Sequence, residues 1–319
     1  MNEQARNFEA RPATRSEEPM LLGMIGPPGG GKSLSSLRIA RGIQSVRGGD
    51  IIVIDTEGGR SRKYNDQIPF KIVELTDAKS DILLEAIRAQ LPANPAAIIV
   101  DSMSDEHETY LEWHDAEVKN FGGNEWAAWS KPKAGRRKLI SGILKIRVPL
   151  IFTFRAREKT KQNPDAKNKQ DKIVNIGWQP VAPLEIVHTL DLTCILPPRA
   201  DGVPVWKSDK IGEDFIIKLP NYLAPYIEAG KPLNEGMGAA FARWAKGGSA
   251  APVRQPAGAA DDLTAAEWDV KLGEAAKEGT IELRRVYAQI PKELRPDVDA
   301  ALNRRHLPMA REVDARAPA

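Results

Sequence analysis

From residue 20 onward, the chain alternates between short apolar runs and longer amphipathic stretches. Short apolar runs bounded by turn residues are typical of strands buried on both faces. Helix-length stretches between such strands indicate βαβ units, so we expect an α/β fold with a mostly parallel central sheet flanked by helices. The runs that we expect to form strands are MLLGMI, IIVID, FKIVEL, AAIIVD and VPLIFTF.

The pattern changes twice toward the end of the chain. After residue 179, LEIVHTLDLTCILPP, PVWKSD and DFIIKL predict a helix or strand followed by shorter strands at the sheet edge. Gly, Ala and Pro accumulate over residues 235–262, a composition typical of linkers. We therefore expect a core over residues 20–234 and a linker over 235–262, preceded by a polar, mobile tail over residues 1–19.

Residues 263–319 predict a small helical C-terminal segment. Thr264 and Glu267 have the spacing of a capping box, in which each side chain binds a free amide of the first helical turn. Apolar residues recur beyond this cap up to about residue 313, which indicates two or three small packed helices.

Composition and charge exclude several classes of protein. The 319 residues contain 46 Lys and Arg against 43 Asp and Glu, a net charge of +3, so any DNA site has to be a local patch. The single cysteine, Cys194, cannot form an internal disulfide, and four histidines do not suggest a zinc site. No apolar run reaches the roughly 18 residues needed to span a bilayer. We expect neither secretion nor membrane insertion, and a cytoplasmic protein.

The segment from Gly26 to Ser33 matches the phosphate-binding pattern G-x-x-x-x-G-K-[ST]. It follows an expected strand and precedes an amphipathic stretch, as the motif requires. Glycines let backbone amides turn toward phosphates, and the helix N-terminus adds a positive dipole end. Lys32 would bind the β- and γ-phosphates of ATP, and Ser33 would ligate Mg²⁺. A Gly-Pro turn without a ligand is the alternative. The expected nucleotide contacts are Gly26, Pro27, Pro28, Gly29, Gly30, Gly31, Lys32, Ser33 and Leu34.

Two expected strands end in acidic residues. Asp101 ends AAIIVD and is our candidate for the Walker-B carboxylate, which holds Mg²⁺ through water. Glu57 follows IIVID and could orient or deprotonate the water that attacks the nucleotide, with Asp55 as its competitor. In both cases the alternative is an acid that only stabilises a turn.

The segments GPPGGGKS, IIVIDTEGG, AAIIVDS and VPLIFTFRAREKT together resemble the ATPase core of the RecA superfamily. The likeness covers residues 20 to 220, and is strongest to phage RecA-like ATPases of the AAA-type single-strand annealing and recombination family. It implies a RecA-like core that assembles into a ring or filament of identical subunits. That superfamily carries its catalytic glutamate between the Walker A and Walker B segments, which makes Glu57 the implied base, since Ser102 rather than an acid follows Asp101.

The resemblance also implies a γ-phosphate sensor at the end of the strand after Walker B. Arg155 occupies that position, where the family often has Gln, and Arg157 is the alternative sensor. Cations on a late strand act across the subunit interface in RecA, which points to Lys207 and Lys210. The last fifty residues resemble a helical segment on several phage recombination proteins. They could bind a recombination or single-strand-binding protein.

Residues 155–172 contain seven cations and three acids, a larger surplus of positive charge than that of the whole chain. We expect a mobile loop that binds the phosphates of single-stranded DNA without sequence preference, with Trp178 as a stacking residue. A solvated charged hairpin is the alternative. The candidate DNA contacts beyond Arg155 are Arg157, Lys159, Lys161, Lys167, Lys169 and Lys172.

A second basic cluster lies in the long segment before residue 146. It consists of Arg136, Arg137 and Lys138, near an expected loop at residues 121–124. Trp126 and Trp129 in the same segment are expected to lie in a helix core.

Three functions fit these features. The first is a DNA-stimulated ATPase in phage recombination, annealing or repair. The second is a nucleotide-kinase-like phosphotransferase in which residues 155–172 close as a lid. The third is an ATP-gated loader with little turnover that acts through residues 263–319.

Overall fold

The computed structural model describes residues 10, 20–162, 173–247, 264–290 and 294–316. Contacts divide the chain into two units, Met1–Ala251 and Pro252–Ala319. Apart from residue 10, the expected tail over residues 1–19 lies outside the described residues.

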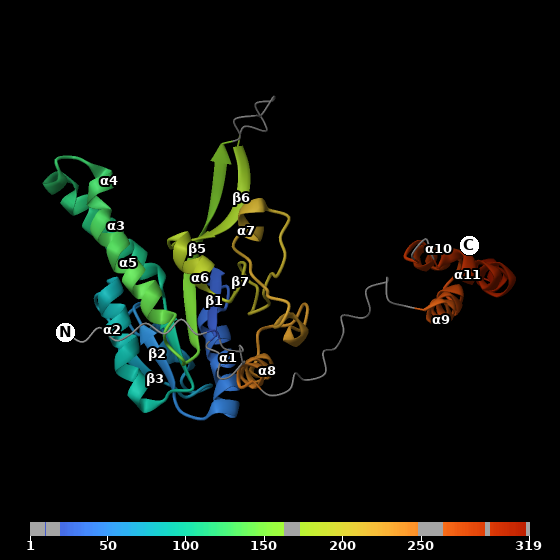
Figure 1. The fold of residues 1–319 in the computed structure, drawn as a ribbon, viewed down its shortest axis with the longest axis horizontal. Coiled ribbons are helices and arrows are strands. Elements are labelled where there is room, and N and C mark those ends of the chain that lie inside the picture. The colour runs from blue at the N-terminus through green and yellow to red at the C-terminus, as the bar shows by residue number, and fades with distance from the viewer. Residues whose placement is uncertain (1–9, 11–19, 163–172, 248–263, 291–293, 317–319) are drawn as a thin grey trace. The chain divides into compact units, whose positions relative to one another are not determined.

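A mostly parallel sheet forms the centre of the first unit (Figure 1). Its strands are β1 (Leu21–Gly26), β2 (Ile51–Asp55), β3 (Lys71–Glu74), β4 (Ala97–Asp101), β5 (Leu150–Gln162), β6 (Ile173–Pro180) and β7 (Leu192–Ile195). The described residues form seven strands in the order β3-β2-β4-β5-β1-β7, with β6 paired to β5. All pairs are parallel except β5–β6. The expected α/β fold class is confirmed.

Helices cover both faces of this sheet (Figure 1). The α-helices in the described part of this unit are α1 (Lys32–Arg47), α2 (Ser80–Gln90), α3 (Ser104–Glu117), α4 (Glu125–Ala128), α5 (Ser130–Ile143), α6 (Leu184–Thr189), α7 (Ile211–Asp214) and α8 (Glu235–Ala245). Four short 3-10 segments accompany them in the described residues of this unit: Arg60–Tyr64 (η1), Leu91–Ala93, Val118–Phe121 (η3) and Ala224–Tyr226. None of the described helices is long and apolar enough to cross a membrane.

Alternate residues of β1, β2, β4 and β5 belong to two cores, one on each face of the sheet. In β1, Leu21 and Ile25 pack in a cluster with residues of α2, α5 and α6. Leu22 and Met24, which point to the opposite face, pack in a second cluster with residues of α1 and α8. Since successive strand side chains point to opposite faces, a strand covered on both sides has to be apolar throughout, as the sequence of β1 is.

Helix α8 corrects the expected linker over residues 235–262. Residues 235–245 are helical and pack against α1, while residues 248–263 lie outside the described part. A Cβ on Gly238 would lie 2.1 Å from the carbonyl oxygen of Ile39, and one on Gly42 would lie 2.0 Å from that of Glu235. The small residues that resemble a linker in the sequence therefore allow two helix backbones to approach closely.

The expected late edge strands are only partly present. β7 pairs with β1 at the edge of the sheet, but residues 205 and 218 each form a single isolated bridge, to Ile195 and Thr193. One bridge satisfies few backbone groups, so these segments remain loops between short helices. Trp126 also departs from expectation: its side chain is 83% exposed, whereas Trp129 is half-buried and stacks on His114.

Residues 155–162, the described part of the cationic segment, belong to a strand rather than to the loop that we expected. β5 continues past the sheet through Gln162 and pairs antiparallel with β6, as Figure 1 shows. The pairing satisfies the backbone groups of a charged segment, while its long side chains reach water. Residues 163–172, which include Lys167, Lys169 and Lys172, lie outside the described residues.

The second unit is a small helical bundle. It contains α9 (Ala265–Ala276), α10 (Thr280–Ala288), α11 (Arg295–Ala301) and α12 (Leu307–Arg316), with a π-helical turn at Leu302–His306. Its described residues thus hold four α-helices, more than the two or three that we expected. Trp268, Leu272 and Leu283 lie in its apolar core. The predicted capping box of Thr264 and Glu267 is confirmed.

Gly238→Val tests the α1–α8 contact. The new side chain would overlap the Ile39 carbonyl, so we expect the free energy of unfolding to fall by about 1–3 kcal/mol, the usual cost of overpacking. Urea denaturation measures it. Gly236→Ala is the control, because its Cβ would meet only the Asn234 side chain, at 3.1 Å. Equal stability of Gly238→Val and the unchanged protein would contradict the proposed close contact.

Candidate functional site

The phosphate-binding loop joins β1 to α1 with the geometry that its glycines allow. Gly29 and Gly31 have φ angles of 78° and 89°, in the left-handed region that favours glycine. Helix α1 begins at Lys32 with no side-chain cap and no acidic residue in its first turn. Its first amides therefore lack the usual side-chain acceptor, and an anion can take that place. Lys32 Nζ donates to the Pro27 carbonyl oxygen at 3.0 Å.

Asp101 lies directly beside this loop. Ser33 Oγ donates to Asp101 Oδ2 at 2.6 Å, and Thr153 Oγ1 of β5 donates to Asp101 Oδ1 at 2.5 Å. A hydroxyl and a carboxylate are hard oxygen donors of the kind that Mg²⁺ prefers. The donor set at Ser33 and Asp101 therefore fits this cation, and Thr153 fixes the orientation of the carboxylate.

Asp55 and Glu57 have different environments, which separates two residues that the sequence left as competitors. Asp55 is buried, and its carboxylate accepts from the amides of Glu57 and Gly59 at 3.0 and 2.8 Å. It also accepts from the Ser61 hydroxyl at 2.6 Å. Asp55 thus holds the turn after β2 together. Glu57, by contrast, lines the cleft beside Lys32.

Arg155 sits at the end of the sheet-bound part of β5, in register with Gly26 of β1. Its guanidinium contacts Asp105, and its Nη2 donates to Glu108 Oε2 at 2.8 Å. Its Nε lies 3.8 Å from Glu57 Oε1, yet this buried nitrogen has no hydrogen-bond partner among the described residues. The alternative sensor, Arg157, points to solvent, with 72% of its side chain exposed, and reaches Glu108 at 3.4 Å.

These groups surround one cleft of about 440 Å³. The sequence had pointed to part of its lining: Pro28, Gly29, Gly31, Lys32, Ser33, Glu57 and Arg155. Five further lining residues were missed, namely Thr56, Arg60, Lys63, Tyr64 and Asp105. Three of them, Arg60, Lys63 and Tyr64, lie on η1. Their basic and aromatic side chains directly follow the IIVIDTEGG segment, and this position was the sequence feature that could have identified them. Asp105 lies in the first turn of α3, and its Oδ2 accepts a hydrogen bond from Thr56 Oγ1 at 2.5 Å.

The cleft shifts the pKa of two of its groups. Burial lowers the pKa of Lys32, against the opposing effect of Asp101 and Glu57. Burial raises the pKa of Glu57, and the nearby charge of Asp101 adds to the shift, whereas Arg155 opposes it. The carboxylate of Glu57 is therefore more basic than that of an exposed glutamate.

The remaining cations that the sequence singled out lie elsewhere. Lys159 and Lys161 are exposed on the β5–β6 hairpin. Lys207 is exposed in a loop, and Lys210 lies 3.6 Å from Glu158 and 3.7 Å from Glu213. Neither lysine lies on a strand, so the expected late strand at this position is absent from the described fold. Trp178 is half-buried against the sheet core, which limits its use for stacking.

The second basic cluster divides between core and surface. Arg136 is buried, binds Glu106 at 3.1 Å and lies over the rings of Tyr110 and Trp129. It is a structural residue that joins α3 to α5. Arg137 and Lys138 are exposed on the opposite side of α5.

Three comparisons with known proteins bear on this site. A search of curated proteins finds no match to the chain. Among solved structures, the crystal structure of the KaiC-like protein PH0186 from the hyperthermophilic archaeon Pyrococcus horikoshii OT3 is similar to it. The two are 16% identical over 56% of this chain and 72% of that chain, with a TM-score of 0.33.

A family model described as an AAA domain matches residues 18–196, which is more than half of the chain. The match includes the phosphate-binding loop, Glu57, Asp101 and Arg155. The chain therefore belongs to the AAA domain family and carries a P-loop nucleotide-binding domain.

Proposed function

We propose that the chain is an ATP hydrolase that acts on single-stranded DNA in phage recombination, annealing or repair. One observation carries the hydrolase part of the proposal: a single cleft brings Lys32, Ser33, Glu57 and Arg155 together, with Asp101 bonded to Ser33. Hydrolysis needs a phosphate cradle, a metal site and a base, and each has a candidate within this cleft.

ATP would bind with its phosphates over the amides of the loop and the ammonium of Lys32. Ser33 and Asp101 would hold Mg²⁺, which offsets the negative charge of the phosphates when bound. Tyr64 is the aromatic residue in the cleft lining and can pack against the base. Arg60 and Lys63 add positive charge beside it.

Glu57 would take the proton of the attacking water. A carboxylate whose pKa is raised by burial is a better general base near neutral pH than an exposed one. Asp55 is a poor candidate for this role because its oxygens already accept hydrogen bonds from the turn.

Arg155 is the better candidate for the γ-phosphate sensor. Its Nε is a buried donor that has no acceptor among the residues that the structure describes, and an oxygen of the γ-phosphate would provide one. Arg157 is mostly exposed and is better suited to bind DNA.

The β5–β6 hairpin is the proposed DNA contact. Arg157, Lys159 and Lys161 follow Arg155 along the same strand, so one rigid element joins the cleft to the cationic hairpin. At about 3.3 Å per residue, Lys161 lies about 20 Å along the strand from Arg155. Movement of this strand would couple DNA binding to ATP turnover. We further propose that the protein assembles into a ring or filament and that the second unit binds a partner protein.

Glu57→Gln tests the base. We expect turnover to fall by about 10²–10⁴-fold, the usual contribution of a general base, with ATP affinity nearly unchanged. Phosphate release and binding of a fluorescent ATP analogue measure the two effects. Lys32→Ala is the contrasting variant, because it should weaken nucleotide binding itself. Normal turnover by Glu57→Gln would assign the base to another group.

The same variant has a predicted effect on stability. Since the pKa of Glu57 is raised in the folded protein from its ordinary 4.5, this group favours folding at low pH and loses that contribution as pH rises through the raised pKa. Glu57→Gln should therefore raise the melting temperature at pH 7 to 8, and the difference should shrink toward pH 4. Thermal unfolding across this range checks it, and a variant less stable at pH 8 would contradict the sign.

Phosphate release with and without an oligonucleotide tests the DNA part. We expect stimulation by single-stranded DNA that declines steeply with salt. Lys159→Ala/Lys161→Ala should reduce the salt dependence of binding by about 1.4 in the log–log slope, since each phosphate contact on a single strand contributes about 0.7. A rate unaffected by DNA would refute this part, and transfer of phosphate to a nucleoside monophosphate would indicate a kinase.

A further inference from the structure

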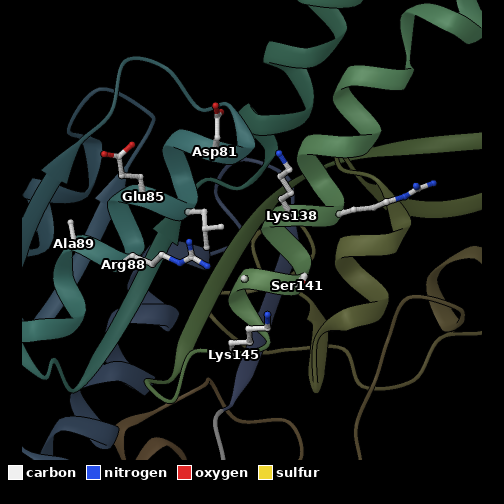
Figure 2. A pocket seen from close by; sticks show the side chains of 10 residues that line it. Asp81, Glu85, Arg88, Ala89, Lys138, Ser141 and Lys145 are labelled. Atoms are coloured by element: carbon white, nitrogen blue, oxygen red, sulfur yellow. The ribbon is translucent and has the colours of Figure 1, made fainter. Parts of the chain in front are cut away.

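A second and larger hollow lies away from the nucleotide cleft, between α2 and α5. Its volume is about 910 Å³, compared with about 440 Å³ for the cleft. Figure 2 shows it bordered by Asp81, Glu85 and Arg88 on α2 and by Lys138 and Ser141 on α5. We call this hollow the α2–α5 groove; its other lining residues are Leu84, Ala89, Arg137, Gly142 and Lys145.

The floor of the groove is apolar, and the two helices approach closely there. A Cβ on Gly142 would lie 2.6 Å from both terminal methyl groups of Leu84, so a larger residue there would require the Leu84 side chain to move. Leu84 and Gly142 are buried, whereas Ala89 and Ser141 are exposed. Two helices that pack side by side leave a furrow of the kind that accepts a third helix.

The rim carries unbalanced positive charge. Four cations, Arg88, Arg137, Lys138 and Lys145, face two acids on α2. None of these six side chains takes part in an ion pair or hydrogen bond among the described residues. Helix α5 itself has no acidic residue, and its five cations are Lys131, Lys133, Arg136, Arg137 and Lys138.

Part of this charge has a local explanation. Arg88 lies in the last turn of α2 and Asp81 in its first turn, where each interacts favourably with the helix dipole. Arg136 is neutralised by Glu106. No such explanation applies to Arg137 and Lys138 of α5 or to Lys145 in the turn that follows it, which leaves three cations beside an apolar floor.

We propose that the α2–α5 groove binds an acidic amphipathic helix of a partner protein. Its apolar residues would cover Leu84 and Ala89, and its carboxylates would pair with Arg137, Lys138 and Lys145. An apolar centre with a charged rim is the usual composition of a protein interface. A nucleic acid strand fits less well, because sites for single strands combine cations with aromatic stacking residues and the groove lining has none.

Fluorescence anisotropy with a labelled synthetic peptide tests the proposal. The probe is a helical peptide with Leu on one face and Glu on the other, and the control peptide has Lys in place of Glu. We expect the full-length protein to bind the Glu peptide and not the Lys peptide. Arg137→Glu/Lys138→Glu should weaken binding of the Glu peptide by about tenfold or more.

Two further variants keep the test specific. Ser141→Glu places a negative charge in the exposed wall of the groove and should also weaken binding, without removing a cation. Arg304→Glu/Arg311→Glu changes the net charge equally at two exposed positions of the second unit and should leave binding unchanged. Thermal unfolding confirms that each variant is folded.

The alternatives give different results. Equal loss in the Arg304→Glu/Arg311→Glu control would mean that the peptide responds only to net charge, which overturns the proposal. Failure of the Glu peptide to bind would also overturn it. So would binding of a single-stranded oligonucleotide, but not of the peptide, that Arg137→Glu/Lys138→Glu weakens. The measurement needs no nucleotide, so it stands or fails independently of ATP hydrolysis.

Discussion

The hydrogen bond between Ser33 and Asp101, 2.6 Å long, joins the two segments on which the nucleotide site depends. It can form because parallel strands end at the same edge of a sheet, and because β5 alone separates β1 from β4. That intervening strand contributes Thr153, which fixes the second oxygen of Asp101, and Arg155, which lies beside the loop. The strand order thus determines which side chains can contact a nucleotide at this edge of the sheet.

Charge balance is the second constraint on this edge. Glu57, Asp101 and Asp105 lie close together, and without cations they would repel one another and a triphosphate. Arg155 contacts Asp105 and Glu108 and approaches Glu57. Lys32 interacts electrostatically with Asp101 and Glu57. The guanidinium of Arg155 is therefore held by carboxylates. A phosphate group in the cleft could replace them as its partner. Such an exchange of partners is a physical means for the occupant of the cleft to influence β5 and the hairpin that continues it.

Close backbone contacts made by small residues shape the rest of the first unit. Gly42 and Gly238 let α1 and α8 pack against each other, and Gly142 lets α5 reach Leu84 of α2. The first contact closes one core of the sheet, and the second creates the floor of the α2–α5 groove. At the contact between α1 and α8 a side chain would meet backbone atoms, so the same residue type that suggests flexibility in a sequence produces tight packing in the fold.

The sequence by itself determined the α/β class, the phosphate-binding loop, the capping box of the second unit and the acidic strand ends. These features are local, since each follows from spacing within a few residues and from the periodicity of apolar positions. Only the tertiary structure distinguished the environments of Asp55 and Glu57, because the difference lies in which amides surround each carboxylate. It also decided that residues 235–245 are a helix, that residues 155–162 continue a strand and that Trp126 is exposed. These outcomes depend on contacts between residues that are distant in the chain. Local composition does not tell which of these residues lie close together in the fold.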